Sequence, residues 1–518
     1  FKQKTAYEIS LGLVGSEMCI RDRYGVGPSI ENGFYYDFLF SKPLKESDLL
    51  DIELEMKKIV KSSQNFVRSE ITKKDATKLF KKQTLKIELI ESAESNEGVG
   101  NDTVSLYHND EFVDLCMGPH IPNTSLLKYF KLTKLSGAYW RGDETNIQLQ
   151  RIYGTSWFSK EDLNTYLIQQ EEAEKRDHRK LGNELDLFTT SEELGSGNFL
   201  WKPKGAILRD VIESYSKKAH MNNGYSLVNT PHIGKSILWE TSGHLDHYSE
   251  NMYPPISHDE NNETYYLKPM NCPFHILVYK SDLHSYKELP LRYFEFGSVY
   301  RYEKTGVLHG LLRLRGFTQD DAHIFCTTAQ INDEVKTLLS FSVNLLGCYG
   351  LTEIEADLST KPNKYIGSDS DWENATNSLK QSLTELEVPF KTAEGEGAFY
   401  GPKIDLHAKD AIGRRWQLST IQIDFAQPDN FSIEYVNSEN KKERPVMIHR
   451  ALLGSVERFT AVLLEHYAGN LPGWLSPTQI DILTIGNVEE YKDKLLKDLK
   501  DYRVSIDNSC LLYTSDAA

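Results

Sequence analysis

Residues 301–323, which read RYEKTGVLHGLLRLRGFTQDDAH, constrain the possible folds of this chain more than any other segment. Their pattern predicts two apolar strands joined by a charged loop, with Arg301 and Glu303 on one side and Arg313 and Phe317 on the other. An arginine guanidinium is a planar fork that binds phosphate, and a phenylalanine ring can stack on a purine. The segment can therefore form a site for a purine polyphosphate, although for an arbitrary hairpin the residues alone favour a solvated loop with scattered charges.

The same segment resembles motif 2 of the class II aminoacyl-tRNA synthetases, in which Arg-x-Glu is followed by a loop and Arg-x-x-x-Phe. The stretches RGFTQDDAHIFC and KPMNCPFH are similar to those of threonyl-tRNA synthetases, and the likeness extends from about Gly25 to about Ser505. The resemblance implies an α+β fold. It places a class II antiparallel sheet flanked by helices after a mixed α/β editing domain and before a fragment of an α/β anticodon-binding domain.

Length and composition limit the class of protein. A chain of 518 residues is too long for one core and predicts about two to four domains. No run of about 20 apolar residues is present, so no membrane-spanning helix is expected.

Six cysteines without paired spacing, and the lack of a cleavable signal, predict a reducing, cytoplasmic location. The net charge of −16 argues against a nucleic-acid coat, but an RNA substrate needs only a local basic patch.

Sequence patterning also predicts the order of the domains. Aromatic and β-branched strands without strict βαβ repeats predict an antiparallel α+β sheet in the longest domain. Helices are expected at residues 46–60, 207–221 and 452–467. The expected segments are a non-native tail at 1–23, an incomplete editing domain at 24–159, a linker helix at 160–182, the catalytic domain at 183–473, an anticodon-binding fragment at 474–508 and a second non-native tail at 509–518.

Cys272, His323 and His449 are too far apart in the sequence for their spacing to indicate a metal site. The resemblance implies that they are the catalytic zinc ligands, because they stand in NCPFH, DDAH and MIHR. One thiolate and two imidazoles would leave a fourth coordination position open. An open zinc can accept both the amino and the hydroxyl group of threonine, whereas valine has a methyl group in place of the hydroxyl.

The other site residues are likewise implied by the resemblance. Residues 452–467, LLGSVERFTAVLLEHY, have a helical period and match motif 3. Pro231 stands where motif 1 has its proline. The match to motif 1 implies a homodimer through the catalytic domain. Catalysis is expected from Arg301 and Lys403, with His244 handling a proton during transfer to tRNA. The ATP-binding residues would be Arg301, Glu303, Arg313, Phe317, Gln417 and Arg458, with Mg²⁺, and the threonine-binding residues Asp321, Gln319, Tyr400, Met270 and Gln422.

A second site is implied by VDLCMGPH, which resembles the editing site of the threonyl enzymes. Serine lacks only one methyl group of threonine, worth about 1–3 kcal/mol, so an editing step is expected. The family's site also needs a His-x-x-x-His helix, and GLVGSEMCIRDR stands in its place without a histidine. Hydrolysis of Ser-tRNA is therefore expected to be weak or absent. The expected editing residues are Cys116, His120, Asp114, Tyr107 and Lys86.

The preferred hypothesis is a threonine–tRNA ligase whose partners are ATP, L-threonine and tRNA(Thr), with one Zn²⁺ per subunit. One alternative is a catalytically inactive, synthetase-like regulatory or RNA-binding protein, but Arg301, Arg458 and the implied zinc ligands are all present. Another is a different class II specificity, such as seryl or prolyl. The Cys-His-His set argues against that second alternative.

Overall fold

The structure is a computed structural model that describes residues 23–92, 102–257, 263–484 and 488–507, apart from positions 31, 41, 144, 367 and 399. The chain forms two compact units, Phe1–Glu171 and Glu172–Ala518, and each is described by itself. The two expected non-native tails lie outside the described residues, apart from Arg23. Among the described residues, no helix is both long enough and apolar enough to cross a membrane.

The first unit contains a sheet in which the strands β1 (Arg23–Tyr24), β3 (Gly33–Leu39), β8 (Gln148–Trp157) and β7 (Tyr129–Tyr139) follow in that order, with β2 (Ser29–Ile30) also paired to β3. Helix α2 (Asp48–Ser62) packs on this sheet, and Phe34, Phe38, Leu49 and Met56 are buried in the core of that unit. The expected helix at residues 46–60 is thus found two residues further along the chain. Burial of these apolar side chains stabilises the fold by about 1.5–3 kcal/mol for each.

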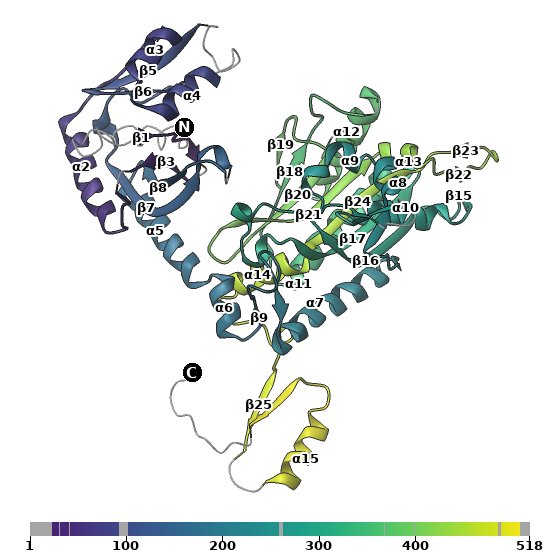
Figure 1. The fold of residues 1–518 in the computed structure, drawn as a ribbon. Helices are drawn as coiled ribbons and strands as arrows, with labels where there is room; N and C mark the ends of the chain where they lie inside the picture. Colours follow the sequence, from purple (N-terminus) through teal and green to yellow (C-terminus); the bar gives the residue numbers. More distant parts are fainter. Residues whose placement is uncertain are drawn as a thin grey trace. The chain divides into compact units, whose positions relative to one another are not determined.

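A second sheet in this unit carries two of the expected editing residues, Tyr107 and Asp114. Its strands β4 (Phe66–Thr72), β5 (Thr103–Asn109) and β6 (Phe112–Leu115) are antiparallel, and the helices α3 (Lys73–Leu79) and α4 (Thr84–Ser92) belong to the same region (Figure 1). Tyr107 on β5 lies directly opposite Asp114 on β6. Because side chains of opposite residues leave the same face, these two point to the same side of the sheet.

The second unit is built on an eight-stranded sheet in the order β11-β16-β17-β24-β21-β20-β18-β19. All pairs are antiparallel except β11 with β16 and β18 with β19, at the two edges. The predicted antiparallel α+β fold is therefore confirmed. The strand bounds are β11 Ser226–Leu227, β16 Leu291–Tyr300, β17 Gly316–Cys326, β18 Ile354–Ser359, β19 Phe390–Ala393, β20 Lys403–Lys409, β21 Arg415–Asp424 and β24 Val446–Ser455.

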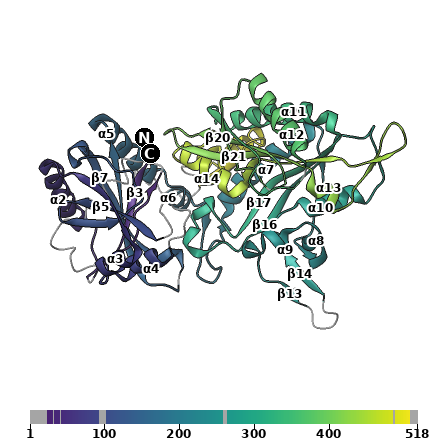
Figure 2. The same ribbon diagram turned by 90° about the horizontal axis from the view of Figure 1, so that it is seen from above.

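Helices α7 (Pro203–Asn222), α11 (Ile331–Cys348), α12 (Asp369–Glu385) and α14 (Val456–His466) flank this sheet (Figures 1 and 2). Their apolar residues join those of the strands in one buried cluster, which includes Ile212, Leu338, Leu379 and Phe459. Smaller strands and helices extend the unit around α10 (Cys272–Lys280), with its own apolar cluster. The expected helix at residues 207–221 is thus confirmed, and it begins earlier, at a proline in its first turn.

Two sequence predictions about helices were wrong. The expected linker helix is broken, because α5 ends at Lys175 and Asp177 caps the start of α6 (His178–Glu184) by accepting from Arg179 N. The helix expected at residues 452–467 begins only at Val456, because the preceding residues complete strand β24. There the backbone N–H groups of Leu452 and Leu453 donate to the buried carboxylate of Asp320, which secures them in the strand.

The last described segment is a small βαβ arrangement. Strand β25 (Ile480–Leu483) pairs in parallel with β26 (Val504–Asp507), and α15 (Glu489–Asp498) connects them in sequence. Arg503 donates to the carbonyl oxygens of Trp474 and Ser476, at 2.7 and 3.0 Å. The predicted strand and helix are present, and β26 is an additional strand that the sequence pattern did not indicate.

Candidate active site

The predicted hairpin is formed by β16 and β17, which pair from Leu291 with Phe325 to Tyr300 with Gly316. The loop between them carries two short 3₁₀ turns, η4 (Thr305–Val307) and η5 (Gly310–Leu312). Arg315 anchors this loop by donating from Nε to the carbonyl oxygen of Glu303 at 2.9 Å. The charged residues of the loop are thus held over the start of β17.

A cleft of about 380 Å³ opens beside this hairpin, between the loop, β21 and the start of α14. Its volume is within the range of small-molecule sites, which is about 300–1,000 Å³. Ser455 caps α14 by accepting from Arg458 N at 3.0 Å, so the helix begins at the cleft. The cleft brings together all the residues that the resemblance assigns to ATP: Arg301, Glu303, Arg313, Phe317, Gln417 and Arg458.

The charges in this cleft suit an anion. The Arg301 guanidinium lies 5.1 Å from the centre of the Phe317 ring. Burial and the nearby positive charge of Arg313 lower the pKa of Arg458 below its usual range. Glu303 pairs with Arg313 at 2.9 Å, so this arginine is already oriented by a carboxylate. A polyphosphate would therefore meet guanidinium groups that converge from two sides of the cleft.

The three implied metal ligands, Cys272, His323 and His449, come together although the sequence separates them widely. One ligand atom from each lies within 4.8 Å of the other two. His323 on β17 and His449 on β24 are directly opposite in the sheet, and their rings are 4.8 Å apart. Cys272 is the first residue of α10, and it is buried.

Neighbouring groups orient both imidazoles. His449 Nε2 lies 2.7 Å from Asp424, which also accepts from the backbone N–H of Ala426 and Gln427. His323 Nδ1 lies 2.8 Å from His275. Each histidine therefore keeps one further ring nitrogen for a ligand, as metal-binding histidines do.

Burial shifts the pKa of two members of this set, Cys272 and His323. It lowers the pKa of His323 well below its ordinary value, so this imidazole is neutral, as a metal ligand must be. It raises the pKa of the Cys272 thiol well above its ordinary value, and the charges of Asp321 and Asp424 add to the effect. One cysteine sulfur and two imidazoles fit the donor preference of zinc.

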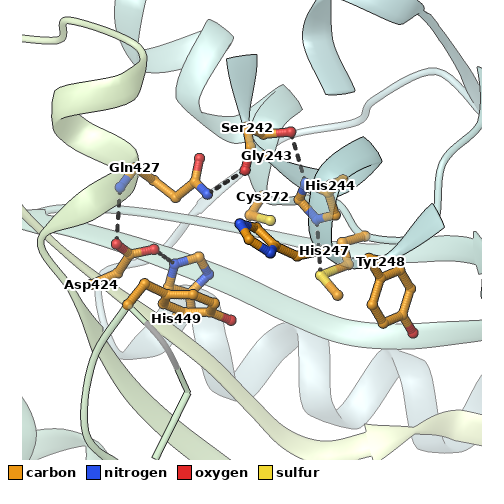
Figure 3. Close-up of a pocket in the computed structure, with 11 residues that line it drawn as sticks. Ser242, Gly243, His244, His247, Tyr248, Cys272, Asp424, Gln427 and His449 are labelled. Carbon is orange, nitrogen blue, oxygen red and sulfur yellow. Dashed lines mark hydrogen bonds and ion pairs between the residues drawn. The ribbon is translucent and has the colours of Figure 1, made fainter. Parts of the chain in front are cut away.

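A small pocket of about 60 Å³ adjoins this cluster (Figure 3). Two of the predicted threonine-binding residues, Met270 and Tyr400, line it together with Cys272 and His449. Gln422, a third, accepts a hydrogen bond from Tyr400 Oη at 3.1 Å. The pocket is therefore adjacent to the possible metal site and lined by predicted amino-acid-binding residues.

The remaining predicted residues have different places. Asp321 accepts from Asn271 at 3.0 Å, lies 3.7 Å from His323 Nε2, and has a pKa raised by burial. Gln319 lines the larger cleft rather than the small pocket. Lys403 is opposite Gln422 in the sheet, but its ammonium pairs with Asp405 at 2.8 Å, and it lines neither cavity.

His244 lines the small pocket, and both its ring nitrogens are engaged. Nδ1 lies 2.7 Å from Ser242 Oγ (Figure 3). Nε2 lies 3.2 Å from Met270 Sδ. Burial lowers its pKa to about 4. Sequence reasoning missed His247 and Asp424, which line the same pocket. The sequence offered only one signal for His247, its place in HLDH, one helical turn after His244.

The expected editing residues also lie together in the first unit. Lys86 and Asp114, both buried, form an ion pair at 2.6 Å. The rings of Tyr107 and His120 are 4.0 Å apart, and burial lowers the pKa of His120 to about 4. Cys116 packs with Tyr107.

Sequence reasoning missed Tyr36, whose hydroxyl donates to Asp114 at 2.5 Å and accepts from Lys86 at 3.1 Å. In the sequence Tyr36 was indistinguishable from the other aromatic residues of GFYYDF. The place expected for the missing His-x-x-x-His helix falls almost entirely outside the described residues.

Comparison with known proteins places these features in one family. The family model for the class II tRNA synthetase core domain (G, H, P, S and T) matches residues 253–467, and that for the threonyl and alanyl tRNA synthetase second additional domain matches residues 104–153. The chain is 52% identical over 492 residues to the threonine–tRNA ligase of Sulfurihydrogenibium sp., covering 93% of this chain and 75% of that protein. It is 49% identical over 499 residues to that of Borrelia duttonii, covering 95% and 84%.

Solved structures agree with this relationship. The RNA binding domain of threonyl-tRNA synthetase from Cryptosporidium parvum matches with a TM-score of 0.62 and 42% identity, over 65% of this chain and 84% of that one. A putative threonyl-tRNA synthetase from Aeropyrum pernix matches with a TM-score of 0.57 and 32% identity, over 64% and 80%. By its sequence and its fold, this chain belongs to the threonine–tRNA ligase family of class II aminoacyl-tRNA synthetases.

Proposed function

We propose that this chain activates L-threonine with ATP to form threonyl-adenylate and transfers the threonyl group to tRNA(Thr). The observation that carries the proposal is the placement of two sites on the same strands. On β17, Phe317 and Gln319 line the larger cleft, and His323 lies four residues after Gln319 in the metal-like cluster. Four residues of strand span about 13 Å, so an amino acid held at the cluster can direct its carboxylate towards a nucleotide in the cleft.

Cys272, His323 and His449 would hold a zinc ion, and the adjoining pocket would hold the threonine side chain. A bound zinc ion would supply a Lewis acid with an open position for the amino and hydroxyl groups of threonine. Asp424 orients His449, and His275 orients His323. Asp321 is the carboxylate nearest to this set on β17, and it would take the substrate ammonium.

ATP, with Mg²⁺, would occupy the larger cleft. The threonine carboxylate attacks the α-phosphorus in line, and Arg301 stabilises the charge that develops on the transferred group. Arg313 and Arg458 would bind the pyrophosphate, while Phe317 would stack on the adenine and Glu303 would hold Arg313. These roles require positioning and electrostatics, and no covalent nucleophile of the protein takes part.

For the transfer step, His247 is a second candidate beside the predicted His244, because both residues line the small pocket. Both ring nitrogens of His244 are engaged by Ser242 and Met270, and its low pKa of about 4 makes it a poor proton acceptor at neutral pH. His247 lines the same pocket from the same helix, α9 (His244–His247).

The editing residues would form a second, folded site for Ser-tRNA(Thr), supported by the Lys86–Asp114–Tyr36 network, with weak or absent hydrolysis because the His-x-x-x-His sequence of the family is missing. The family's role in translation supports a cytoplasmic location.

An inactive, regulatory protein is disfavoured because the cleft retains every predicted ATP-binding residue and the Cys-His-His cluster retains every predicted zinc ligand.

The decisive experiment is threonine-dependent ATP–pyrophosphate exchange by the purified chain, which needs no tRNA. Exchange should be fastest with threonine and slower with serine by about 10- to 200-fold, because serine lacks one methyl group. Valine should support almost none, since it cannot supply the hydroxyl. Equal exchange with valine and threonine would contradict zinc-based selection, and no exchange with any amino acid would contradict the proposed activity.

A homodimer through the catalytic unit is also proposed, because β11 is an open edge of the large sheet. Leu227 on this strand is 44% exposed, and Ile233 nearby in the sequence is 45% exposed. Leu227→Glu should therefore shift the chain from dimer to monomer in light scattering after gel filtration. Leu386→Glu, at an exposed leucine just before the opposite edge strand β19, is the matched control and should leave the dimer intact. A Leu227→Glu chain that stays dimeric would place the interface elsewhere.

A further inference from the structure

The turn η5 (Gly310–Leu312) forms part of the wall of the nucleotide cleft, and Arg313 follows it directly. Leu311 is fully buried, and Leu312 accepts a hydrogen bond from Arg458 Nη1 at 3.4 Å. The Arg313 side chain itself is more than half exposed. The position from which its guanidinium reaches into the cleft is thus set by the backbone of this turn.

His178, more than 130 positions away in the sequence, lies directly behind the turn. Leu311 N donates to His178 Nε2 at 3.0 Å, and the imidazole is fully buried. Because Nε2 accepts this bond, the ring proton is on Nδ1, which donates to Glu465 at 2.7 Å. Asp177, His178 and Glu465 have the composition of a metal site, but both ring nitrogens of the histidine are already used.

The absence of a side chain at Gly310 leaves room for the His178 imidazole. A Cβ atom added at Gly310 would lie 2.1 Å from His178 Nε2, which is far closer than any carbon and nitrogen can approach. The φ angle of Gly310 is also +48°, a left-handed conformation that favours glycine. The turn can therefore reach the imidazole only because it has no side chain at this position.

Glu465 connects the histidine to the other arginine of the cleft. It belongs to α14, whose first turn carries Arg458, and its second carboxylate oxygen pairs with Arg414 at 2.7 Å. The backbone N–H of His178 donates to Glu465 as well, at 3.1 Å. The turn before Arg313 and the helix of Arg458 are thus joined through one buried imidazole.

We propose that His178 is a positioning residue of the nucleotide cleft, which fixes the turn before Arg313 against the helix that carries Arg458. This inference rests on the proposed binding of ATP in that cleft. Under this proposal, helix α6, which follows the helix break at Arg176, has a role in the catalytic unit. His178 touches no reacting atom and acts through the Leu311 backbone.

Two substitutions separate the two hydrogen bonds of the imidazole. His178→Asn places an amide donor near the position of Nδ1, and it loses the acceptor for Leu311 N. His178→Gln reaches the position of Nε2 with an amide oxygen, and it loses the donor to Glu465. The control is His309→Asn, because His309 is an exposed histidine of the same loop whose ring is 5.9 Å from that of His178.

The measurements are the KM values for ATP and threonine in pyrophosphate exchange, and the affinity for ATP alone by calorimetry. His178→Asn should raise the KM and the Kd for ATP about ten-fold, as expected for one lost buried hydrogen bond. The KM for threonine and the zinc content should not change. His178→Gln should recover most of the ATP affinity, and His309→Asn should behave as the unsubstituted chain.

The inference is overturned if His178→Asn binds ATP normally, or if both His178 variants lose ATP and threonine affinity to the same extent. The latter would indicate a general structural role. Failure of the proposed function has a different result: the unsubstituted chain would show no amino-acid-dependent exchange. The effect of the His178 substitutions on ATP binding would still be measured directly by calorimetry. An unsubstituted chain that binds no ATP would also overturn the inference.

Discussion

Arg301→Ala is expected to lower threonine-dependent pyrophosphate exchange about 100- to 1,000-fold, the usual effect of removing one group that stabilises transition-state charge. The Arg301 guanidinium lies over Phe317 and donates from Nε to the carbonyl oxygen of Pro269 at 3.3 Å, so it is held at the wall of the cleft. The loss should be in kcat, because the developing charge on the transferred group exists mainly in the transition state.

Two variants make this prediction specific. Arg301→Lys keeps the charge and loses the planar fork, so its exchange rate should lie between those of Arg301→Ala and the unsubstituted chain. Lys304→Ala removes an exposed cation from the same loop, and it should exchange normally. Zinc content should be unchanged in all three. Normal adenylation by Arg301→Ala would exclude the role assigned to this arginine.

Cys272→Ala should remove the bound metal and, with it, threonine-dependent exchange. The thiolate is the only sulfur ligand in the set of Cys272, His323 and His449, and two imidazoles alone bind zinc far more weakly. Zinc measured by elemental analysis should fall from about one ion per chain to a small fraction. In the cobalt-substituted protein, the thiolate-to-metal absorption should disappear.

Cys326→Ala is the matched control, because Cys326 is a fully buried cysteine on the same strand as His323 but outside the cluster. It should keep its zinc and its exchange activity. A Cys272→Ala chain that retained one zinc ion and threonine-specific exchange would show that the metal is held elsewhere. Reloading the unsubstituted, chelator-treated chain with zinc should restore its activity, whereas Cys272→Ala should not recover.

The amino-acid sequence was sufficient for much of the fold. The pattern of residues 301–323 predicted two apolar strands joined by a charged loop, and that loop predicted the nucleotide cleft. The motif 3 helix was placed four residues early, because Leu452 continues the apolar period of the helix although its backbone belongs to β24. The period of a sequence shows only which side chains are apolar. The buried end of a strand and a helix both contain apolar side chains, so the period alone does not separate them.

The sites differ in how far the sequence could define them. Resemblance to a family supplied Cys272, His323 and His449, but their spacing alone carried no metal signal. It also supplied His244, whose ring nitrogens the structure shows to be engaged by Ser242 and Met270. Tyr36 and Asp424 were missed because an aromatic residue and an aspartate in buried strands are typical of many cores.

By itself, the sequence determined most of the secondary structure and the local motifs, because side-chain period and turn residues act over a few positions. Only the tertiary structure decided which distant residues share a site. Pairing of β17 with β24 put His323 opposite His449, and packing of α6 under the loop put His178 behind Leu311. Such contacts depend on strand register and on helix packing across the core, and these are properties of the whole chain rather than of any segment.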